Sequence, residues 1–83
     1  MEIKIITAAP EKRKPKPADE TKLGFGKIFT DHFFTMKYRA GHWHDPVIEP
    51  YRPLSLDPTA MCLHYAQEIF EGMKAYRGKN GAI

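Results

Sequence analysis

Seven prolines divide this chain of 83 residues and limit which segments can join a helix or a regular sheet. Proline fixes its own φ angle and has no backbone N–H to donate, so it suits linkers, sheet edges and the first turn of a helix. The chain is also short, since a domain of about 60 residues buries only about 60% of the surface that its unfolded chain exposes. Any core is therefore small, and the single cysteine, Cys62, leaves no internal disulfide to support it.

Residues 1–22 combine a short alternating run with three prolines and dense charge. Such a composition does not offset the entropy cost of ordering, so we expect a flexible, basic, proline-rich tail whose residues 8–22 are extended and polyproline-like. The run KRKPK at residues 12–16 resembles a polyanion-binding sequence, although in such a tail solvated disorder is the simpler interpretation. The net charge of only +3, with no basic surface interleaved with aromatic residues, argues against a nucleic-acid partner.

The apolar runs of the chain are far shorter than the roughly 20 residues that a membrane-spanning helix needs, and no signal-peptide pattern opens the sequence. We therefore expect a protein without a membrane partner. Together with the unpaired cysteine, this favours the cytoplasm as its location.

Residues 23–38 are rich in aromatic and β-branched side chains and are interrupted at Asp31-His32, so they predict two short strands joined by a turn or bulge. Residues 41–46 predict a loop. Residues 47–51 are expected at a sheet edge or in ordered coil, because three prolines surround them and remove ladder donors, namely Pro46, Pro50 and Pro53.

The clearest local signal is Asp57-Pro58, since aspartate caps a helix N-terminus well and proline suits the first helical position. Apolar residues then recur at helical spacing, at Met61, Tyr65 and Ile69, which predicts a helix over residues 58–71 that stops at Gly72.

Residues 73–76 alternate as a strand, and Asn80-Gly81 is a strong hairpin signal. The chain ends two residues later at Ile83, which indicates an incomplete element. We therefore expect short strands and one helix, in which residues 1–22 form the tail and residues 23–83 form an incomplete small domain.

Few residues offer chemistry by pattern alone. His42, His44 and Asp45 have weak metal-ligand spacing, and ordinary loop histidines are the more economical interpretation. Cys62 and His64 lie two apart on the expected helix, so they diverge by about 200° and cannot act as a nucleophile and base. No metal site is predicted. By the same helical pattern, Tyr65 and Phe70 are core aromatics.

Two separated segments, residues 25–32 (FGKIFTDH) and residues 64–75 (HYAQEIFEGMKA), together with residues 53–58, resemble the N-terminal part of a branched-chain amino-acid aminotransferase. These are fold-type IV enzymes dependent on pyridoxal phosphate. The resemblance covers residues 23–83 and implies an α+β fold of antiparallel strands with one packed helix, which is part of the small N-terminal domain. It also implies a homodimeric parent that moves the amino group of leucine, isoleucine or valine to 2-oxoglutarate.

The resemblance carries roles onto four matching positions. Phe25, Tyr65 and Phe70 would line an apolar substrate pocket, with Tyr65 reaching the neighbouring subunit's site, and Gly72 would let the backbone approach that site closely. Aromatic rings suit such a wall because they supply rigid apolar area without charge.

The catalytic chemistry is not expected in this chain. In the family the Schiff-base lysine and most cofactor contacts lie much later, and none of the nine lysines here matches that position. The 83 residues alone are expected to be inactive, with no catalytic or cofactor-binding residue of their own, and Lys27 and Lys74 are interpreted as surface or pocket-rim charges.

Three alternatives remain. Two are other fold-type IV enzymes, a D-amino-acid aminotransferase or an aminodeoxychorismate lyase, which the proline-rich insertion at residues 37–58 disfavours. The third is a small basic module that binds polyanions through residues 12–16. It predicts salt-dependent binding that disappears when residues 1–22 are deleted.

Overall fold

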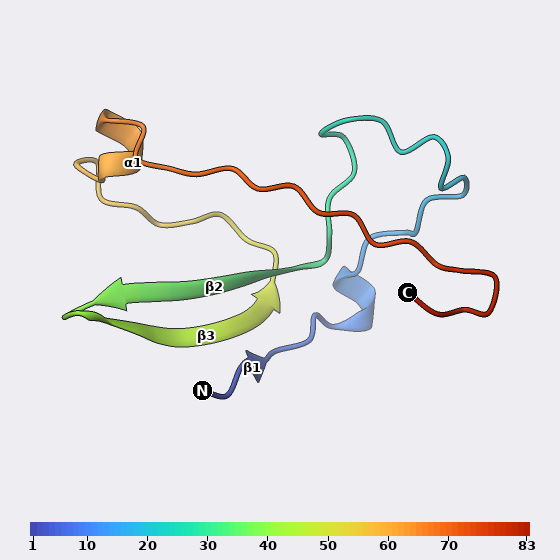
Figure 1. Cartoon of the computed structure of the whole chain (residues 1–83), viewed down its shortest axis with the longest axis horizontal. Coiled ribbons are helices and arrows are strands. Elements are labelled where there is room, and N and C mark those ends of the chain that lie inside the picture. Colours follow the sequence, from blue (N-terminus) through green and yellow to red (C-terminus); the bar gives the residue numbers. More distant parts are fainter. The chain divides into compact units, whose positions relative to one another are not determined.

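The computed structural model describes residues 1–83 and divides into two compact units, Met1–Pro53 and Leu54–Ile83. The first unit contains a three-stranded sheet of order β1-β3-β2 and a short 3-10 helix, and the second contains one short α-helix (Figure 1). Their bounds are β1 (Lys4–Ile5), η1 (Pro10–Lys12), β2 (His32–Arg39), β3 (His42–Pro50) and α1 (Met61–His64). The predicted α+β class is confirmed, although the sheet is mixed rather than purely antiparallel.

β2 and β3 form a hairpin closed by two residues, Ala40 and Gly41, whose φ angles are 51° and 79°. Two successive positive φ angles define the turn whose twist best matches that of paired strands. Directly beside the turn, Tyr38 and Trp43 face each other with ring centroids 5.1 Å apart in an edge-to-face arrangement. The prediction of a loop over residues 41–46 is therefore wrong, because the chain reverses within two residues and re-enters the sheet at His42.

A β-bulge interrupts the hairpin. Thr35 lies opposite Val47, whereas Lys37 lies opposite His44, so β3 carries one more residue than β2 across this stretch. Asp45 has a φ angle of 54°, a left-handed conformation that aspartate tolerates better than most residues. Pro46 follows it at the point where the ladder is already broken, so its missing N–H costs little.

β3 is the central strand of the sheet, which corrects the expectation that residues 47–51 lie at an edge or in coil. Its prolines lie where no ladder donor is required, Pro46 at the bulge and Pro50 at the last strand position. Between them, Val47 and Ile48 pair on both sides of the strand. Proline therefore sets the limits of the regular segment without excluding it from the middle of the sheet.

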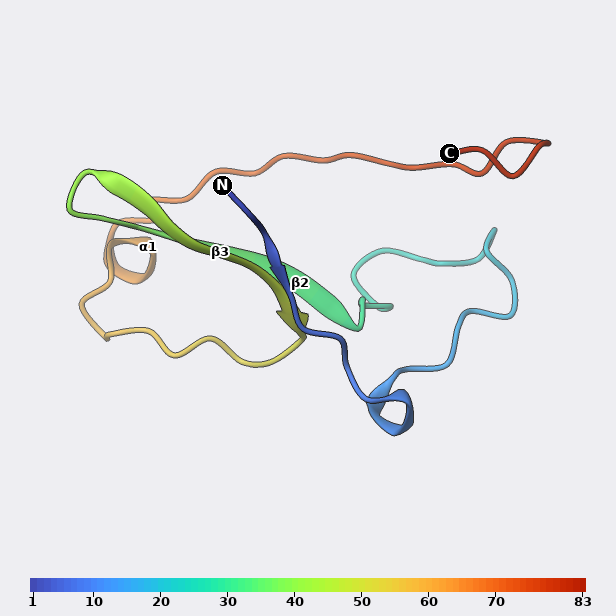
Figure 2. The ribbon, with the colours of Figure 1, turned by 90° about the horizontal axis from the view of Figure 1, so that it is seen from below.

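β1 comes from the segment expected to be a tail and pairs in parallel with β3, through Lys4 opposite Val47 and Ile5 opposite Ile48 (Figure 2). The backbone N–H of Ile6 extends this pairing with a hydrogen bond of 2.8 Å to the carbonyl of Ile48. This segment therefore contains a strand and a 3-10 turn. The flexibility of residues 1–22 and the domain boundary after residue 22 remain predictions.

The predicted strand pair over residues 23–38 is only partly confirmed. β2 begins at His32, and residues 23–31 contain no strand. Gly24 and Gly26 have φ angles of 70° and 68°, which no regular strand accommodates, so the chain bends repeatedly here before it enters the sheet.

The predicted helix over residues 58–71 is much shorter in the structure, where α1 contains only Met61–His64. Asp57 caps a tight turn instead, because its carboxylate accepts hydrogen bonds from the Thr59 backbone N–H at 2.8 Å and hydroxyl at 2.6 Å. The helix ends where Ala66 adopts a φ angle of 51°. An isolated short helix is marginal without a surface on which to pack, and α1 has no buried residue. No helix of the structure is long and apolar enough to cross a membrane.

Near the end of the chain, residues 73–76 form no strand, which corrects a second expectation. A turn is present within residues 78–81, but its two central residues are Lys79 and Asn80, since Gly81, with a φ angle of 77°, donates a 3.0 Å hydrogen bond to the carbonyl of Gly78. Gly78 in turn donates to the carbonyl of Ala82 at 2.6 Å. The turn forms locally, but no strand pair extends from it.

Candidate functional site

Three aromatic side chains singled out by the sequence are strongly exposed. Phe25 in the first unit is 96% exposed, and Tyr65 and Phe70 in the second are 73% and 90% exposed. The interpretation of Tyr65 and Phe70 as core aromatics on a helix is therefore wrong, because both lie outside α1 and neither is buried. Within the second unit the ring beside Tyr65 is that of His64, with centroids 6.3 Å apart.

Gly72 lies in extended chain with open space around it. A Cβ atom placed there would meet no heavy atom within 4 Å, so nothing inside the chain requires a glycine at this position. Any need for glycine at residue 72 must come from atoms outside these 83 residues.

An aromatic cluster that the sequence analysis missed lies at the base of the sheet, by which we mean the end where β2 begins and β3 ends. We call Phe29, Phe33 and Tyr51 the Tyr51 cluster. The Tyr51 ring lies 6.2 Å from that of Phe29 and 6.0 Å from that of Phe33, centroid to centroid. The Lys14 ammonium lies 4.5 Å from the centroid of the Tyr51 ring, and the Arg52 guanidinium 5.6 Å from that of Phe33. Both distances suit cation–π attraction. The aromatic composition was visible in the sequence, but the pairing across 22 positions was not.

Beside this cluster the N-terminal segment encloses a cavity of about 350 Å³. Its wall combines apolar and charged side chains from the N-terminal segment and the base of the sheet: Thr7, Ala8, Ala9, Lys12, Lys14, Asp31, Pro50 and Tyr51. Lys14 fixes one side, since its backbone N–H donates to Asp31 Oδ1 at 2.8 Å and its ammonium donates to the Thr30 carbonyl at 2.6 Å.

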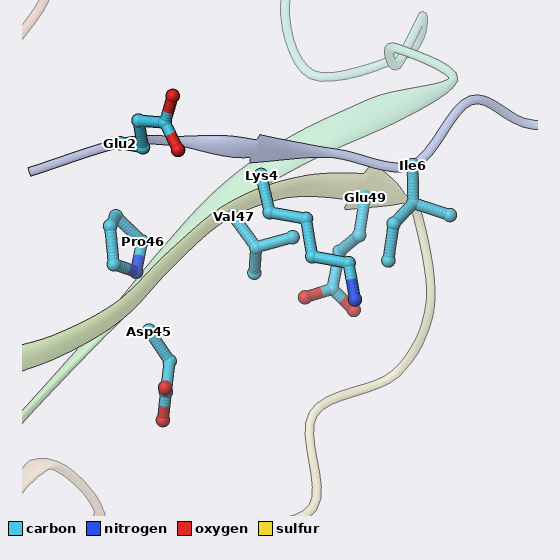
Figure 3. Close-up of a pocket in the computed structure, with 7 residues that line it drawn as sticks. All are labelled: Glu2, Lys4, Ile6, Asp45, Pro46, Val47 and Glu49. Carbon is cyan, nitrogen blue, oxygen red and sulfur yellow. The ribbon is translucent and has the colours of Figure 1, made fainter.

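A second hollow, of about 500 Å³, lies along β1 and β3 (Figure 3). Its lining consists of Glu2, Lys4, Ile6, Asp45, Pro46, Val47 and Glu49. In Figure 3 the side chains of Lys4 and Glu49 extend in the same direction into this space. The hollow is open and mixes three carboxylates with one ammonium group, so it has neither the apolar wall nor the converging polar groups typical of a small-molecule site.

Glu49 is the most strongly engaged carboxylate of the sheet. Arg52 Nε donates to its Oε1 at 2.6 Å and the Thr35 hydroxyl donates to its Oε2 at 3.0 Å. The hydrogen bond from Arg52 lowers the pKa of Glu49 below its usual 4.5, against the opposing effect of partial desolvation. The group is therefore ionised at neutral pH and acts as an anchor between β2 and β3 rather than as an acid.

The histidines of the hairpin do not form a metal centre in this structure. The rings of His42 and His44 lie 6.1 Å apart, centroid to centroid, and at 82° to each other. No three side chains of histidine, cysteine, aspartate or glutamate come together. One ring nitrogen of His44 lies 3.1 Å from the Arg39 carbonyl, which gives that ring a structural partner at the turn.

All nine lysines of the chain are exposed. A lysine that forms a Schiff base is usually activated by desolvation or by a neighbouring cation, so that it is neutral at working pH. Lys27 and Lys74, which lie within the two quoted segments, have no such enclosure and fit the predicted role of surface charges.

Sequence comparisons relate the chain to one group of enzymes. It is 58% identical over 65 residues to branched-chain-amino-acid aminotransferase 2 of Bacillus subtilis (strain 168). It is 61% identical over 61 residues to a probable branched-chain-amino-acid aminotransferase of Streptomyces coelicolor, and 55% identical over 79 residues to a cytosolic one of Saccharomyces cerevisiae. No protein-family model matches the chain.

These matches cover most of this chain and a small part of each relative. They span 77%, 72% and 94% of the chain, but only 18%, 17% and 20% of the three relatives respectively. The chain therefore spans about a fifth of the length of the curated relatives that it matches.

Proposed function

We propose that this chain, which belongs to the branched-chain-amino-acid aminotransferase family, contributes apolar wall residues to the substrate pocket of such an enzyme. The family assignment confirms the resemblance first seen in residues 25–32 and 64–75. The observation that carries the proposal is the identity of 47–61% to several such aminotransferases over most of the chain. The reaction is the transfer of an amino group from leucine, isoleucine or valine to 2-oxoglutarate.

The exposed aromatics support this role. Phe25, Tyr65 and Phe70 leave large apolar areas without partners inside the chain, and such areas are stabilised when something covers them. A branched aliphatic substrate side chain requires a concave apolar wall without competing charge. We place these three rings on that wall, and Gly72 where the backbone approaches the substrate.

The cofactor of the family, pyridoxal phosphate, does not fit the residues of this chain. No lysine here is enclosed, as the Schiff-base lysine must be, and no glycine-rich phosphate loop occurs in the sequence. We therefore assign the cofactor, and every step on it, to the remainder of the parent protein. The chain's own contribution is to orient the substrate side chain and to exclude water from it.

We further propose a homodimeric, cytoplasmic parent in which Tyr65 contacts the substrate bound by the neighbouring subunit. The partners are then an amino acid, a 2-oxo acid and a second copy of the parent, without nucleic acid or membrane. The extensive exposed apolar surface of the 83 residues supports such a covering partner.

The test uses the complete protein and two amino-acid substrates of different size. Phe70→Ala and Tyr65→Ala are expected to lower kcat/KM for leucine by about tenfold or more, because buried methylene groups lose their wall. With alanine as the substrate, which is too small to use that wall, kcat/KM is expected to fall much less. Tyr76→Ala, at a 71% exposed aromatic outside the proposed pocket, is the matched control.

Two results contradict this role. One is an equal loss of kcat/KM for leucine and for alanine as substrates in the Phe70 and Tyr65 variants. The other is a loss of kcat/KM in the Tyr76 control variant as large as in those two variants. Preferential turnover of D-amino acids by the unmodified protein would instead assign a different fold-type IV activity.

A further inference from the structure

We propose that the middle of residues 6–14, a segment that we call the strap, is fastened to the sheet through His32 only while the imidazole of His32 is neutral, so that mild acid releases this middle portion. This conformational device is independent of the proposed substrate pocket. The strap connects β1 to the chain beyond η1 and passes the base of β2 and β3 (Figure 2).

The fastening is one hydrogen bond between residues 24 positions apart. The backbone N–H of Ala8 donates to Nε2 of His32 at 2.8 Å. A backbone N–H can only donate, so Nε2 must be the unprotonated nitrogen and the proton of the neutral ring must lie on Nδ1. When Nε2 takes up a proton, two donors face each other and the bond is lost.

Burial makes this bond important for the strap. Ala8 is 6% exposed and is the only buried residue of the chain, and His32 is half-buried at the start of β2. Water has little access to replace a lost acceptor at Ala8, and an unsatisfied buried donor is costly. Protonation therefore favours a conformation in which Ala8 leaves the sheet and its N–H reaches solvent.

The attachments at the two ends of the strap do not depend on His32. Ile6 donates its N–H to the Ile48 carbonyl at 2.8 Å, and Lys14 is held by Asp31 and by the Thr30 carbonyl. Release is therefore confined to the middle, around η1, while both ends stay attached. The cavity of about 350 Å³ lies under this middle portion and opens when it lifts.

Most of the charged groups around this bond are cationic, so they also favour release of the strap once His32 is protonated. The charged and titratable groups that line the cavity beside Ala8 are Lys12, Lys14, Asp31 and Tyr51, and Glu49 and Arg52 lie next in the chain to Pro50 and Tyr51, of which Pro50 pairs with His32. Arg13 Nε donates to the Ala8 carbonyl at 3.1 Å, which places a cation beside the same peptide. Asp31 opposes release, although its Oδ1 already accepts from the Lys14 backbone N–H, and Glu49 is paired with Arg52.

The direction with pH follows from this geometry. The fastened state requires a neutral imidazole that accepts from Ala8, so protonation of this ring weakens fastening and acid favours release.

The experiment is amide hydrogen exchange read by mass spectrometry on the complete protein at pH 7.5 and pH 5.5, with exposure times scaled for the intrinsic exchange rate. The reporter is a fragment covering residues 5–14, and residues 42–50 of β3 are the internal reference. Protection in the strap is expected to fall about tenfold at pH 5.5 because one buried hydrogen bond is lost, while β3 stays unchanged.

Variants at His32 separate this mechanism from general acid loosening. His32→Gln retains an acceptor that does not titrate, so its strap is expected to stay protected at both pH values. His32→Phe removes the acceptor, so its strap is unprotected at both. His42→Gln, at an exposed histidine away from the strap, keeps the pH response of the unmodified protein. Unchanged protection between the two pH values, loss in β3 as well, or a pH response that survives in His32→Gln would each overturn the proposal.

Discussion

Arg52 Nε lies 2.6 Å from Oε1 of Glu49, and this contact closes the end of the sheet. The second carboxylate oxygen of Glu49 accepts from the Thr35 hydroxyl of β2, so one side chain joins the end of β3 to its neighbouring strand. The Arg52 guanidinium also lies over the Phe33 ring. The ion pair therefore belongs to a small network rather than standing alone on the surface.

Removing the charge of Glu49 is expected to weaken this network in a pH-dependent way. Because the pKa of Glu49 is lowered in the fold, its contribution is present above the ordinary value of 4.5 and is lost as the pH falls through the lowered value. Glu49→Gln should therefore lower Tm at pH 7, and the difference from the unmodified protein should shrink in acid. Thermal unfolding by circular dichroism across this pH range measures it. Glu20→Gln, at an exposed carboxylate, should show no such pH-dependent difference.

The hairpin turn predicts opposite effects at its two residues. Gly41 has a φ angle of 79°, so Gly41→Ala is expected to cost about 1 kcal/mol of unfolding free energy. Ala40 has a φ angle of 51°, and Ala40→Asn places a residue there that tolerates this region, so it should stabilise by a few tenths to about 1 kcal/mol. Chemical denaturation gives both values. Equal effects of the two substitutions would contradict the observed turn.

The Tyr51 cluster is expected to depend on the ring and not on the hydroxyl. Tyr51→Ala removes both aromatic contacts and the cation–π contact with Lys14, for an expected loss of about 1–2 kcal/mol. Tyr51→Phe retains the ring, and the hydroxyl has no hydrogen-bond partner within the chain, so this variant should unfold like the unmodified protein. A large loss in Tyr51→Phe would assign the hydroxyl a role outside these residues.

Gly72→Ala separates folding from function. A Cβ at this position meets open space within the chain, so the stability of these residues should be nearly unchanged. If the backbone approaches the substrate here, kcat/KM for leucine should fall by about tenfold or more, as expected when a methyl group obstructs a binding pocket. Steady-state kinetics and thermal unfolding of the same preparation make the comparison. Full activity in this variant would remove Gly72 from the proposed site.

Local turn chemistry was the most predictable part of the fold. A turn within residues 78–81 follows from Asn80 and Gly81, whereas the α+β class came from the family resemblance. The central position of β3 was not predictable, because it depends on Pro46 falling at a bulge. The sequence does not show that coincidence until the register with β2 is known.

The helix and the site differ for another reason. The apolar stripe from Met61 to Ile69 is real in the sequence, but a stripe stabilises a helix only when it has a surface to cover, and none is present within the second unit. The roles of Phe25, Tyr65, Phe70 and Gly72 came from family resemblance, and they remain proposals.

The bulge at Asp45-Pro46 also sets the phase of the hairpin. Side chains alternate between the two faces of a strand, so residues three apart normally point to opposite faces. Across the bulge, however, His44 and Val47 oppose Lys37 and Thr35, which lie two apart on β2, and therefore share a face. Removing Asp45 or Pro46 would therefore restore regular alternation with the same cross-strand pairs, and Trp43 would keep its face. A one-residue insertion or deletion elsewhere in β3 would instead slip the register and move side chains to the opposite face of the sheet.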